Sequence, residues 1–220
     1  MTLAIFDCDG VLVDSEMLAC QAQSDSLRER GFDLSADDVA ARYIGISSAD
    51  MRTDLERRFA RGLPADHEER AAARLRNLFV SQLRAIPGIP DVLDVVKSMG
   101  IASCIASGSA LDRIALALKV TGLASRFDGP VYSATMVGRG KPAPDLFLYA
   151  AAEMGYEPGE CIVIEDSVPG VQAACAAGMP VIGFSGASHC GPGHAARLRD
   201  AGAEEVAGDS AQLTAKLRDF

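Results

Sequence analysis

Two pairs of acidic residues carry the strongest chemical signal in this sequence of 220 residues. Asp7 and Asp9 follow the apolar run LAIF, and Glu165 and Asp166 follow the run CIVI. Carboxylates this close repel each other unless a cation or a shared proton compensates. An acid–base pair or a hard divalent cation with oxygen ligands satisfies that condition. Because no cluster of Cys or His accompanies the acids in the sequence, we expect Mg²⁺ here rather than zinc.

A serine and a lysine add groups that bind anions. Ser107 ends another apolar run, and Ser107-Gly108-Ser109 leads into a predicted helix whose N-terminus favours an anion. Lys141 is one of four lysines beside seventeen arginines, and it lies in the loop GKPAPD, which two prolines stiffen. Its compact positive charge can hold a phosphate and a carboxylate together. The sequence therefore predicts that Ser107 and Lys141 serve the same site as the acids.

Short apolar runs alternate with helical patterns, which predicts the elements that position these residues. The predicted strands cover residues 3–7, 101–107, 129–134, 161–167, 180–186 and 204–208. The predicted helices between or after them cover residues 110–123, 144–155, 168–178 and 210–220. This alternation indicates an α/β fold with right-handed crossovers and a mostly parallel sheet. The carboxyl ends of its strands meet at one edge, where such sheets bind ligands.

The segment after the first strand has only helical periodicity. We predict an α/β core from residues 1–14 and 86–220, and a helical cap domain of three or four helices from residues 15–85. Such an insertion would lie above the carboxyl edge of the sheet. The alternative is a helical subdomain without a part in catalysis. Residues 15–84 carry 11 arginines against 12 acids, whereas the remainder of the chain carries most of the net charge.

Composition excludes several classes of protein. Apolar residues make up 49% and charged residues 23%, as in soluble globular chains, and no apolar run is long enough to span a membrane. A net charge of −9 disfavours binding to nucleic acid. The six cysteines form no CxxC pair, which indicates reduced thiols. We expect a cytoplasmic protein, a monomer or weak homo-oligomer, whose partner is a small molecule.

The four signals together resemble the haloacid dehalogenase superfamily of hydrolases, in the branch with a helical cap and a Rossmann-like parallel sheet. The matching motifs are DCDGVLVDS at residues 7–15, Ser107, Lys141, and EDS at residues 165–167 followed by Pro169-Gly170. Within the superfamily, DGVLVDSE, GKPAPD and IEDS are similar to the β-phosphoglucomutase-like phosphatases, including those that act on phosphogluconate. The resemblance implies a Mg²⁺-dependent phosphatase for a phosphorylated sugar, sugar acid or polyol.

The resemblance also implies a role for each site residue. Asp7 would attack phosphorus and form an aspartyl-phosphate, and Asp9 would protonate the leaving alcohol and later activate water. Ser107 and Lys141 would bind the phosphoryl oxygens. The implied Mg²⁺ ligands are the Asp7 side chain, the Asp9 carbonyl, and the acidic pair Glu165 and Asp166.

Four other functions compete with this one. A sugar phosphomutase of the β-phosphoglucomutase type would carry a His where this chain has Ala19, and an Arg within the stretch that matches residues 45–50, which has none. Asp9 and the acidic pair argue against dehalogenation, and a cap without lysine argues against phosphonatase chemistry. A non-catalytic binding module would lack one of the motif residues, all of which are present.

Two groups of basic side chains have no assigned role at this point. The Gly-rich loop at 186–198 contains His189 and His194. These histidines could lie at the rim of the site, but the favoured interpretation is a solvent-exposed connection with His194 near the start of a helix. Four cap arginines could contact an anionic substrate, although solvated helix faces are the simpler expectation for each: Arg42, Arg52, Arg74 and Arg76.

Overall fold

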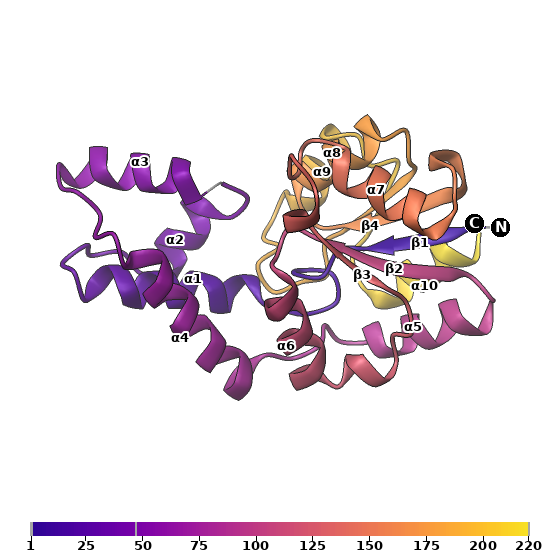
Figure 1. The fold of residues 1–220 in the computed structure, drawn as a ribbon, viewed down its shortest axis with the longest axis horizontal. Coiled ribbons are helices and arrows are strands. Elements are labelled where there is room, and N and C mark those ends of the chain that lie inside the picture. Colours follow the sequence, from indigo (N-terminus) through magenta and orange to yellow (C-terminus); the bar gives the residue numbers. More distant parts are fainter. Residues whose placement is uncertain (1, 47, 220) are drawn as a thin grey trace. The chain divides into compact units, whose positions relative to one another are not determined.

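The computed structural model describes residues 2–46 and 48–219 and divides into two compact units. The α/β unit comprises Met1–Asp14 and Arg84–Phe220, and the helical unit comprises Ser15–Leu83 (Figure 1). Ser47, within the 45–50 stretch considered above, lies outside the described residues. Within the described ranges, no helix combines the length and apolar character that crossing a membrane requires.

A six-stranded parallel sheet forms the centre of the α/β unit. The strands lie in the order β3-β2-β1-β4-β5-β6, and every neighbouring pair is parallel. Their bounds are β1 Leu3–Phe6, β2 Ala102–Ser107, β3 Val131–Ser133, β4 Cys161–Glu165, β5 Val181–Phe184 and β6 Glu205–Ala207. Each lies within a predicted range, so the predicted α/β class with a parallel sheet is confirmed.

Helices cover both faces of this sheet. They are α5 Ile89–Ser98, α6 Leu111–Thr121, α7 Asp145–Met154, α8 Val168–Ala176, α9 His194–Asp200 and α10 Ser210–Arg218, with short 3-10 turns at Leu123–Ser125, Ala134–Met136 and Pro158–Glu160. In Figure 1, α7 and α8 lie on one side of the strands and α5 and α10 on the other. The four residues of β1 are fully buried, as a central strand of a doubly covered sheet requires.

The chain leaves and re-enters the α/β unit at neighbouring points. After β1, Gly10 adopts a left-handed φ of +79°, which a residue with a side chain rarely takes, and the chain turns back sharply. Val13 then bridges to Ala85, and the Asp14 amide donates to the Arg84 carbonyl at 3.1 Å. The helical unit is therefore an insertion that starts and ends at one place on the α/β unit.

The helical unit has its own core. Its helices are α1 Glu16–Arg28, α2 Ala36–Tyr43, α3 Ser48–Phe59 and α4 His67–Gln82. Helix α2 starts with a capping box, in which Ser35 and Asp38 satisfy each other's backbone amides. Apolar residues contributed by this unit alone pack together, among them Leu27, Phe32 and Leu55. The insertion therefore buries apolar surface without a contribution from the α/β unit.

Candidate active site

Lys141 joins two of the predicted acids at the carboxyl edge of the sheet. Its ammonium donates to Asp7 Oδ1 at 2.7 Å, to Glu165 Oε1 at 2.6 Å, and to the Ala106 carbonyl at 3.1 Å. These three side chains are at most 10% exposed. The Lys141 ammonium thus brings together Asp7, Ala106 and Glu165, which lie far apart in the sequence. They meet because three parallel strands end at this edge of the sheet.

The buried charges shift each other's protonation. Burial raises the pKa of Asp7 well above its usual range, Lys141 opposes this, and the neighbouring acids Glu165, Asp166 and Asp9 add to the rise. Burial alone would lower the pKa of Lys141, but the two carboxylates that it contacts raise it above its ordinary value. The ammonium therefore stays charged at neutral pH, and it only partly offsets the effect of burial on Asp7.

Asp9 is held by partners that the sequence did not reveal. Ser109 donates its hydroxyl to Asp9 Oδ2 at 2.5 Å, and the Arg113 guanidinium donates to Asp9 Oδ1 at 3.0 Å. Arg113 comes from the first turn of α6, so its position beside Asp9 depends on the packing of that helix against β3. An arginine on a helix of mixed polarity gives no sequence signal of this contact. Ser107 is buried at the end of β2, and its Oγ accepts from the Ser109 amide at 3.1 Å.

Glu165 is fixed through both of its oxygens. Oε1 accepts from Lys141, and Oε2 accepts from the Ser167 amide at 2.8 Å and from its hydroxyl at 2.9 Å. Ser167 also caps α8 by accepting from the Gly170 amide. Gly170 lies so close that a Cβ there would be 1.8 Å from Glu165 Oε1. The start of α8 therefore holds the Glu165 carboxylate in one orientation.

Asp166 brings the loop histidines into the site, which corrects two expectations. His189 Nε2 lies 3.2 Å from Asp166 Oδ2, and His194 Nε2 donates to the Asp166 carbonyl at 2.6 Å. The His189 side chain is 3% exposed and His194 is buried, so the solvent-exposed connection favoured for them is wrong. The expectation that no Cys or His cluster accompanies the acids is also wrong, because the fold brings residues 189–194 back against β4.

The site carries the donors that a hard divalent cation requires. Four carboxylates, two of them buried beside Lys141, gather at this edge: Asp7, Asp9, Glu165 and Asp166. A Cβ on Gly10 would lie 1.8 Å from Asp166 Oδ2, so this glycine makes room for that carboxylate. After burial, which is the main cause, the acids Glu165, Asp166 and Asp9 each add to the rise in the Asp7 pKa, as expected where acidic groups gather. Oxygen donors with excess negative charge fit Mg²⁺.

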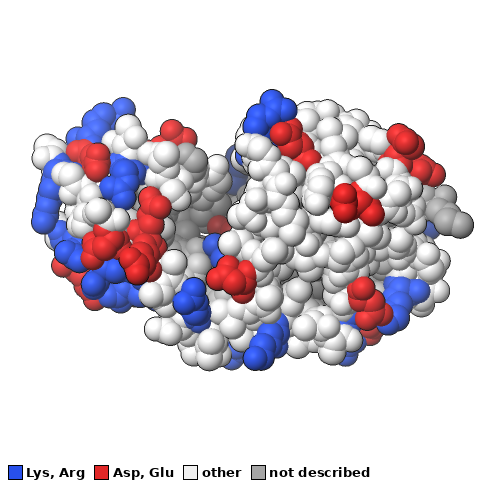
Figure 2. Space-filling model, viewed as in Figure 1, with Lys and Arg blue, Asp and Glu red and all other residues white. Residues whose placement is uncertain are grey.

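Two of the four cap arginines are engaged with acids of their own unit. Arg52 lies 3.6 Å from Glu56 and 3.7 Å from Glu68, and it donates to the Leu63 carbonyl. Arg74 pairs with Glu29. Figure 2 shows basic and acidic side chains next to one another over this unit. These contacts agree with solvated, paired helix faces for Arg52 and Arg74.

Comparison with known proteins identifies the family. The model of the haloacid dehalogenase-like hydrolases matches residues 1–178, most of the chain. The chain belongs to the haloacid dehalogenase-like hydrolase family. The matched range contains every site residue predicted from the sequence and ends before the loop that carries His189 and His194.

Several members of this family are similar over most of the chain. Hexitol phosphatase B of Escherichia coli K12 is 34% identical over 181 residues, which is 80% of each chain. The 6-phosphogluconate phosphatase of the same organism is 29% identical over 188 residues, covering 85% of this chain and 84% of its own. A haloacid dehalogenase family hydrolase from Deinococcus radiodurans, solved with bound phosphate and sodium, has a TM-score of 0.82 at 33% identity, covering 100% of this chain and 96% of its own.

Proposed function

We propose that the chain is a Mg²⁺-dependent phosphatase that hydrolyses a small phosphorylated sugar, sugar acid or polyol through an aspartyl-phosphate. As a haloacid dehalogenase-like hydrolase whose curated relatives are phosphatases, the chain is a phosphoric monoester hydrolase. The observation that carries the finer proposal is the buried Asp7 carboxylate, which Lys141 holds at the edge of the sheet.

In this proposal Asp7 is the nucleophile. Lys141 holds Asp7 Oδ1, which leaves the second oxygen for bond formation with phosphorus. The bond between phosphorus and that oxygen forms while the bond to the leaving alkoxide breaks, and the alkoxide takes a proton from Asp9. Water then gives its proton to Asp9 and attacks phosphorus, which releases Asp7 and inorganic phosphate. The Lys141 ammonium and the Ser107 hydroxyl bind the phosphoryl oxygens.

Asp9 has to change partners before it acts. In the structure its two oxygens accept from Ser109 and Arg113, so Asp9 has to leave these donors and take up a proton from solvent before it can act as the acid. We infer that the arriving substrate competes for these donors, because the phosphate and Asp9 are both anions that the Arg113 guanidinium can bind. Arg113 and Ser109 would thus position Asp9 between turnovers.

The residues that would hold Mg²⁺ are the Asp7 and Asp166 carboxylates, the Asp9 carbonyl, and Glu165. When bound, the ion would reduce the repulsion between Asp7 and the phosphate. Lys141 and Ser167 already donate to both oxygens of Glu165, so direct ligation by this residue uses a lone pair that those bonds leave free. Its hydrogen bonds otherwise make it the residue that keeps Lys141 in place.

The substrate class rests on relatives and on the insertion. Hexitol phosphates and 6-phosphogluconate are small polyol and sugar-acid esters, which are the substrates that the names of two relatives give. We propose that the helical unit acts as the cap, closes over such a substrate and excludes bulk water. Different side chains on the cap would then select among small phosphate esters.

A turnover screen tests the proposal. Release of inorganic phosphate is measured over phosphorylated sugars, sugar acids, polyols and nucleotides, with Mg²⁺ and with excess chelator. We expect turnover of at least one polyol or sugar-acid phosphate, loss of activity in chelator, and no turnover by Asp7→Asn, whose amide cannot attack phosphorus. Full activity in chelator would contradict the Mg²⁺ dependence, and full activity in Asp7→Asn would contradict Asp7 as the nucleophile.

A second measurement separates phosphatase from mutase. Ala19 offers no imidazole where the mutases carry a His, so we expect phosphate release and little isomerisation. Phosphorus NMR of β-glucose 1-phosphate with trace bisphosphate follows both outcomes in one sample. Conversion to glucose 6-phosphate faster than phosphate release from any screened compound would assign the chain as a mutase.

A further inference from the structure

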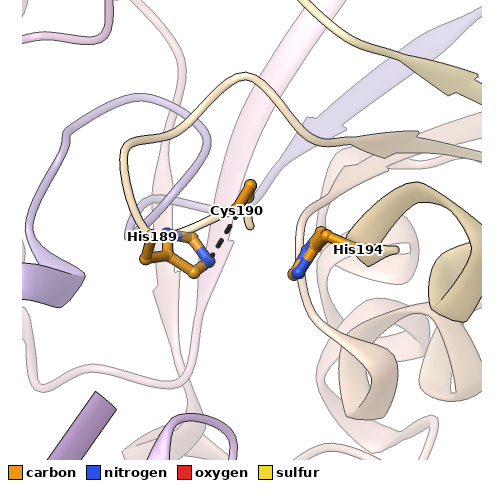
Figure 3. Close-up of side chains that lie close together, drawn as sticks. All are labelled: His189, Cys190 and His194. Atoms are coloured by element: carbon orange, nitrogen blue, oxygen red, sulfur yellow. Dashed lines mark hydrogen bonds between the residues drawn. The ribbon is translucent and has the colours of Figure 1, made fainter. Parts of the chain in front are cut away.

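Two histidines and a cysteine beside the proposed catalytic site form a cluster that the phosphatase mechanism does not use. His189 and Cys190 lie in the loop after β5, and His194 begins α9. Their nearest potential ligand atoms all lie within 4.8 Å of one another. Figure 3 shows the three side chains close together, and the two imidazole rings meet edge to face with their centroids 5.4 Å apart. Imidazole and thiolate are the donors that zinc prefers, whereas Mg²⁺ prefers oxygen.

The separations in the cluster are close to those of a tetrahedral zinc site. Zinc bonds of about 2.0 Å to nitrogen and about 2.3 Å to sulfur place those two atoms about 3.5 Å apart in a tetrahedron. His189 Nε2 lies 3.5 Å from Cys190 Sγ and 3.2 Å from Asp166 Oδ2. Two edges of the tetrahedron therefore exist already, and Asp166 supplies an oxygen as the fourth ligand. His194 has to move toward the other three and give up its hydrogen bond to the Asp166 carbonyl. Its proton then moves from Nε2 to Nδ1, which ends the bond that Nδ1 accepts from Arg197.

The surroundings of the cluster favour a cation. Asp166 contributes a negative charge beside His189, and the His189 side chain is only 3% exposed. Burial, and then Asp166, raise the pKa of the Cys190 thiol to about 12, so the sulfur carries its proton until a metal displaces it.

We propose that His189, Cys190 and His194, with the Asp166 carboxylate, bind a zinc ion, and that this ion inhibits the phosphatase. On binding, the Cys190 S–H bond breaks, a sulfur–zinc bond forms, and the proton passes to solvent. Asp166 then ligates zinc instead of serving the Mg²⁺ site. The inhibition, but not the binding, rests on the proposed function, because it depends on the role of Asp166 in holding Mg²⁺.

Cobalt(II) absorption tests the binding independently of activity. Cobalt takes the place of zinc in such sites, and a cobalt–thiolate bond gives an intense near-ultraviolet charge-transfer band. The full chain is titrated with cobalt alone, with wild type, Cys190→Ser and the matched control Cys175→Ser, which changes a thiol exposed elsewhere in the α/β unit. We expect the band in wild type and Cys175→Ser and its loss in Cys190→Ser. Cooperative thermal unfolding of each variant establishes that it is folded.

Inhibition by zinc at saturating Mg²⁺ tests the consequence. We expect the zinc concentration for half-inhibition, relative to each protein's own zinc-free rate, to rise at least about tenfold in Cys190→Ser, the effect of losing about 1.4 kcal/mol of binding. His194→Gln gives a second variant that removes a ligand while it keeps a donor for the Asp166 carbonyl, and we expect weaker cobalt binding from it.

The two arms distinguish the possible failures. A cobalt band that is absent from wild type, or unchanged in Cys190→Ser, would overturn the zinc site whether or not the protein is a phosphatase. If the band depends on Cys190 but the protein shows no Mg²⁺-dependent turnover, the metal site is supported and the proposed function is overturned. Equal inhibition of wild type and Cys190→Ser by zinc would overturn the inhibitory role.

Discussion

Lys141 is a cation shared by two carboxylates with little water around them. Its side chain is 10% exposed, and those of Asp7 and Glu165 are 9% and 1% exposed. In such surroundings each charge is tolerated because the others are present, and removal of one leaves the rest uncompensated. Lys141, the proposed phosphate-binding residue, thus also stabilises the fold of the α/β unit.

Lys141→Met should destabilise the protein and abolish turnover. The substitution keeps much of the side-chain volume but leaves Asp7 and Glu165 buried without the ammonium, which typically costs about 3 kcal/mol or more. Urea unfolding followed by circular dichroism measures the change. The matched control is Lys97→Met, which removes an exposed pair with Asp128 and should leave the unfolding midpoint close to that of wild type. Equal midpoints for the two variants would contradict a structural role for the buried pair.

At the scale of elements, α8 and β4 form one rigid corner of the site. Ser167 caps the helix with its hydroxyl and donates to Glu165, the last residue of the strand. Gly170, in the first turn of α8, packs against the same carboxylate. The short connection between β4 and α8 therefore fixes the orientation of the Glu165 carboxylate. A glycine at position 170 leaves the space that this carboxylate occupies.

Gly170→Ala should impair stability and turnover together. A methyl group 1.8 Å from Glu165 Oε1 forces the carboxylate or the helix to shift, and overpacking of this kind typically costs about 1–3 kcal/mol. We expect at least about a tenfold loss of activity, because Lys141 loses its partner geometry. Gly159→Ala is the control, since a Cβ there meets nothing within 4 Å. Thermal unfolding and phosphate release measure both effects, and a Gly170→Ala protein as active as the control would oppose the argument.

Helix α4 contributes a pH-dependent term to the stability of the helical unit. His67 is buried, and a neutral ring with its proton on Nε2 satisfies both Gln23 Oε1 at 2.8 Å and Ser26 Oγ at 3.1 Å. Burial, and then Arg52, lower the pKa of His67 below its ordinary value. The unfolded chain therefore binds this proton more tightly, and the stabilisation present above the ordinary His pKa is lost as pH falls through the folded-state value.

Replacing His67 with Gln should flatten this pH dependence. We expect Tm of wild type to fall more steeply than that of His67→Gln as pH drops from about 7.5 to about 5.5, because only wild type takes up a proton at position 67. His194, whose pKa burial also lowers, is present in both proteins, so the difference between the two slopes isolates His67. Parallel Tm curves would show that protonation of His67 does not affect stability.

The sequence allowed prediction of the strands and their acidic ends, because apolar runs followed by Asp or Glu are local patterns. It did not reveal the strand order, nor helix α5, which begins beside Gly88 and Pro90. Arg113 and His189 escaped for a different reason. Arg113 reaches Asp9, about a hundred positions away, through its long side chain, and a loop brings His189 to Asp166, about two dozen positions away. Hydrophobic periodicity carries no information about such contacts.

At the scale of the whole molecule, the two units are separable in sequence. The helical unit is one continuous segment, and the residues at its two junctions are hydrogen-bonded to each other, Asp14 to Arg84. The principal core of the α/β unit contains residues from that unit alone. Each unit thus has a core that its own residues complete.

Deletion of residues 15–83, with a short Gly-Ser linker between Asp14 and Arg84, should leave a folded α/β unit. The junction needs only a tight turn, and the sheet keeps all six strands. We expect cooperative thermal unfolding and Mg²⁺-dependent hydrolysis of p-nitrophenyl phosphate, with loss of preference among sugar, sugar-acid and polyol phosphates. A deletion protein that unfolds without cooperativity, or one that keeps the full substrate preference, would contradict the assignment of selectivity to the helical unit.

The central place of β1 in the sheet has a consequence for synthesis on the ribosome. This strand is made before the other five strands, and of its two neighbours β2 is added about 100 positions later and β4 more than 150 positions later. At about 5–20 residues per second, the apolar segment Leu3–Phe6 waits roughly 8–30 s for β4. In the first part of this interval, before β2 is made, the helical unit is already complete and can fold, while Leu3–Phe6 has no neighbouring strand to pair with. The nascent chain therefore exposes a β-prone segment ahead of the helical unit, where ribosome-associated chaperones have time to bind it.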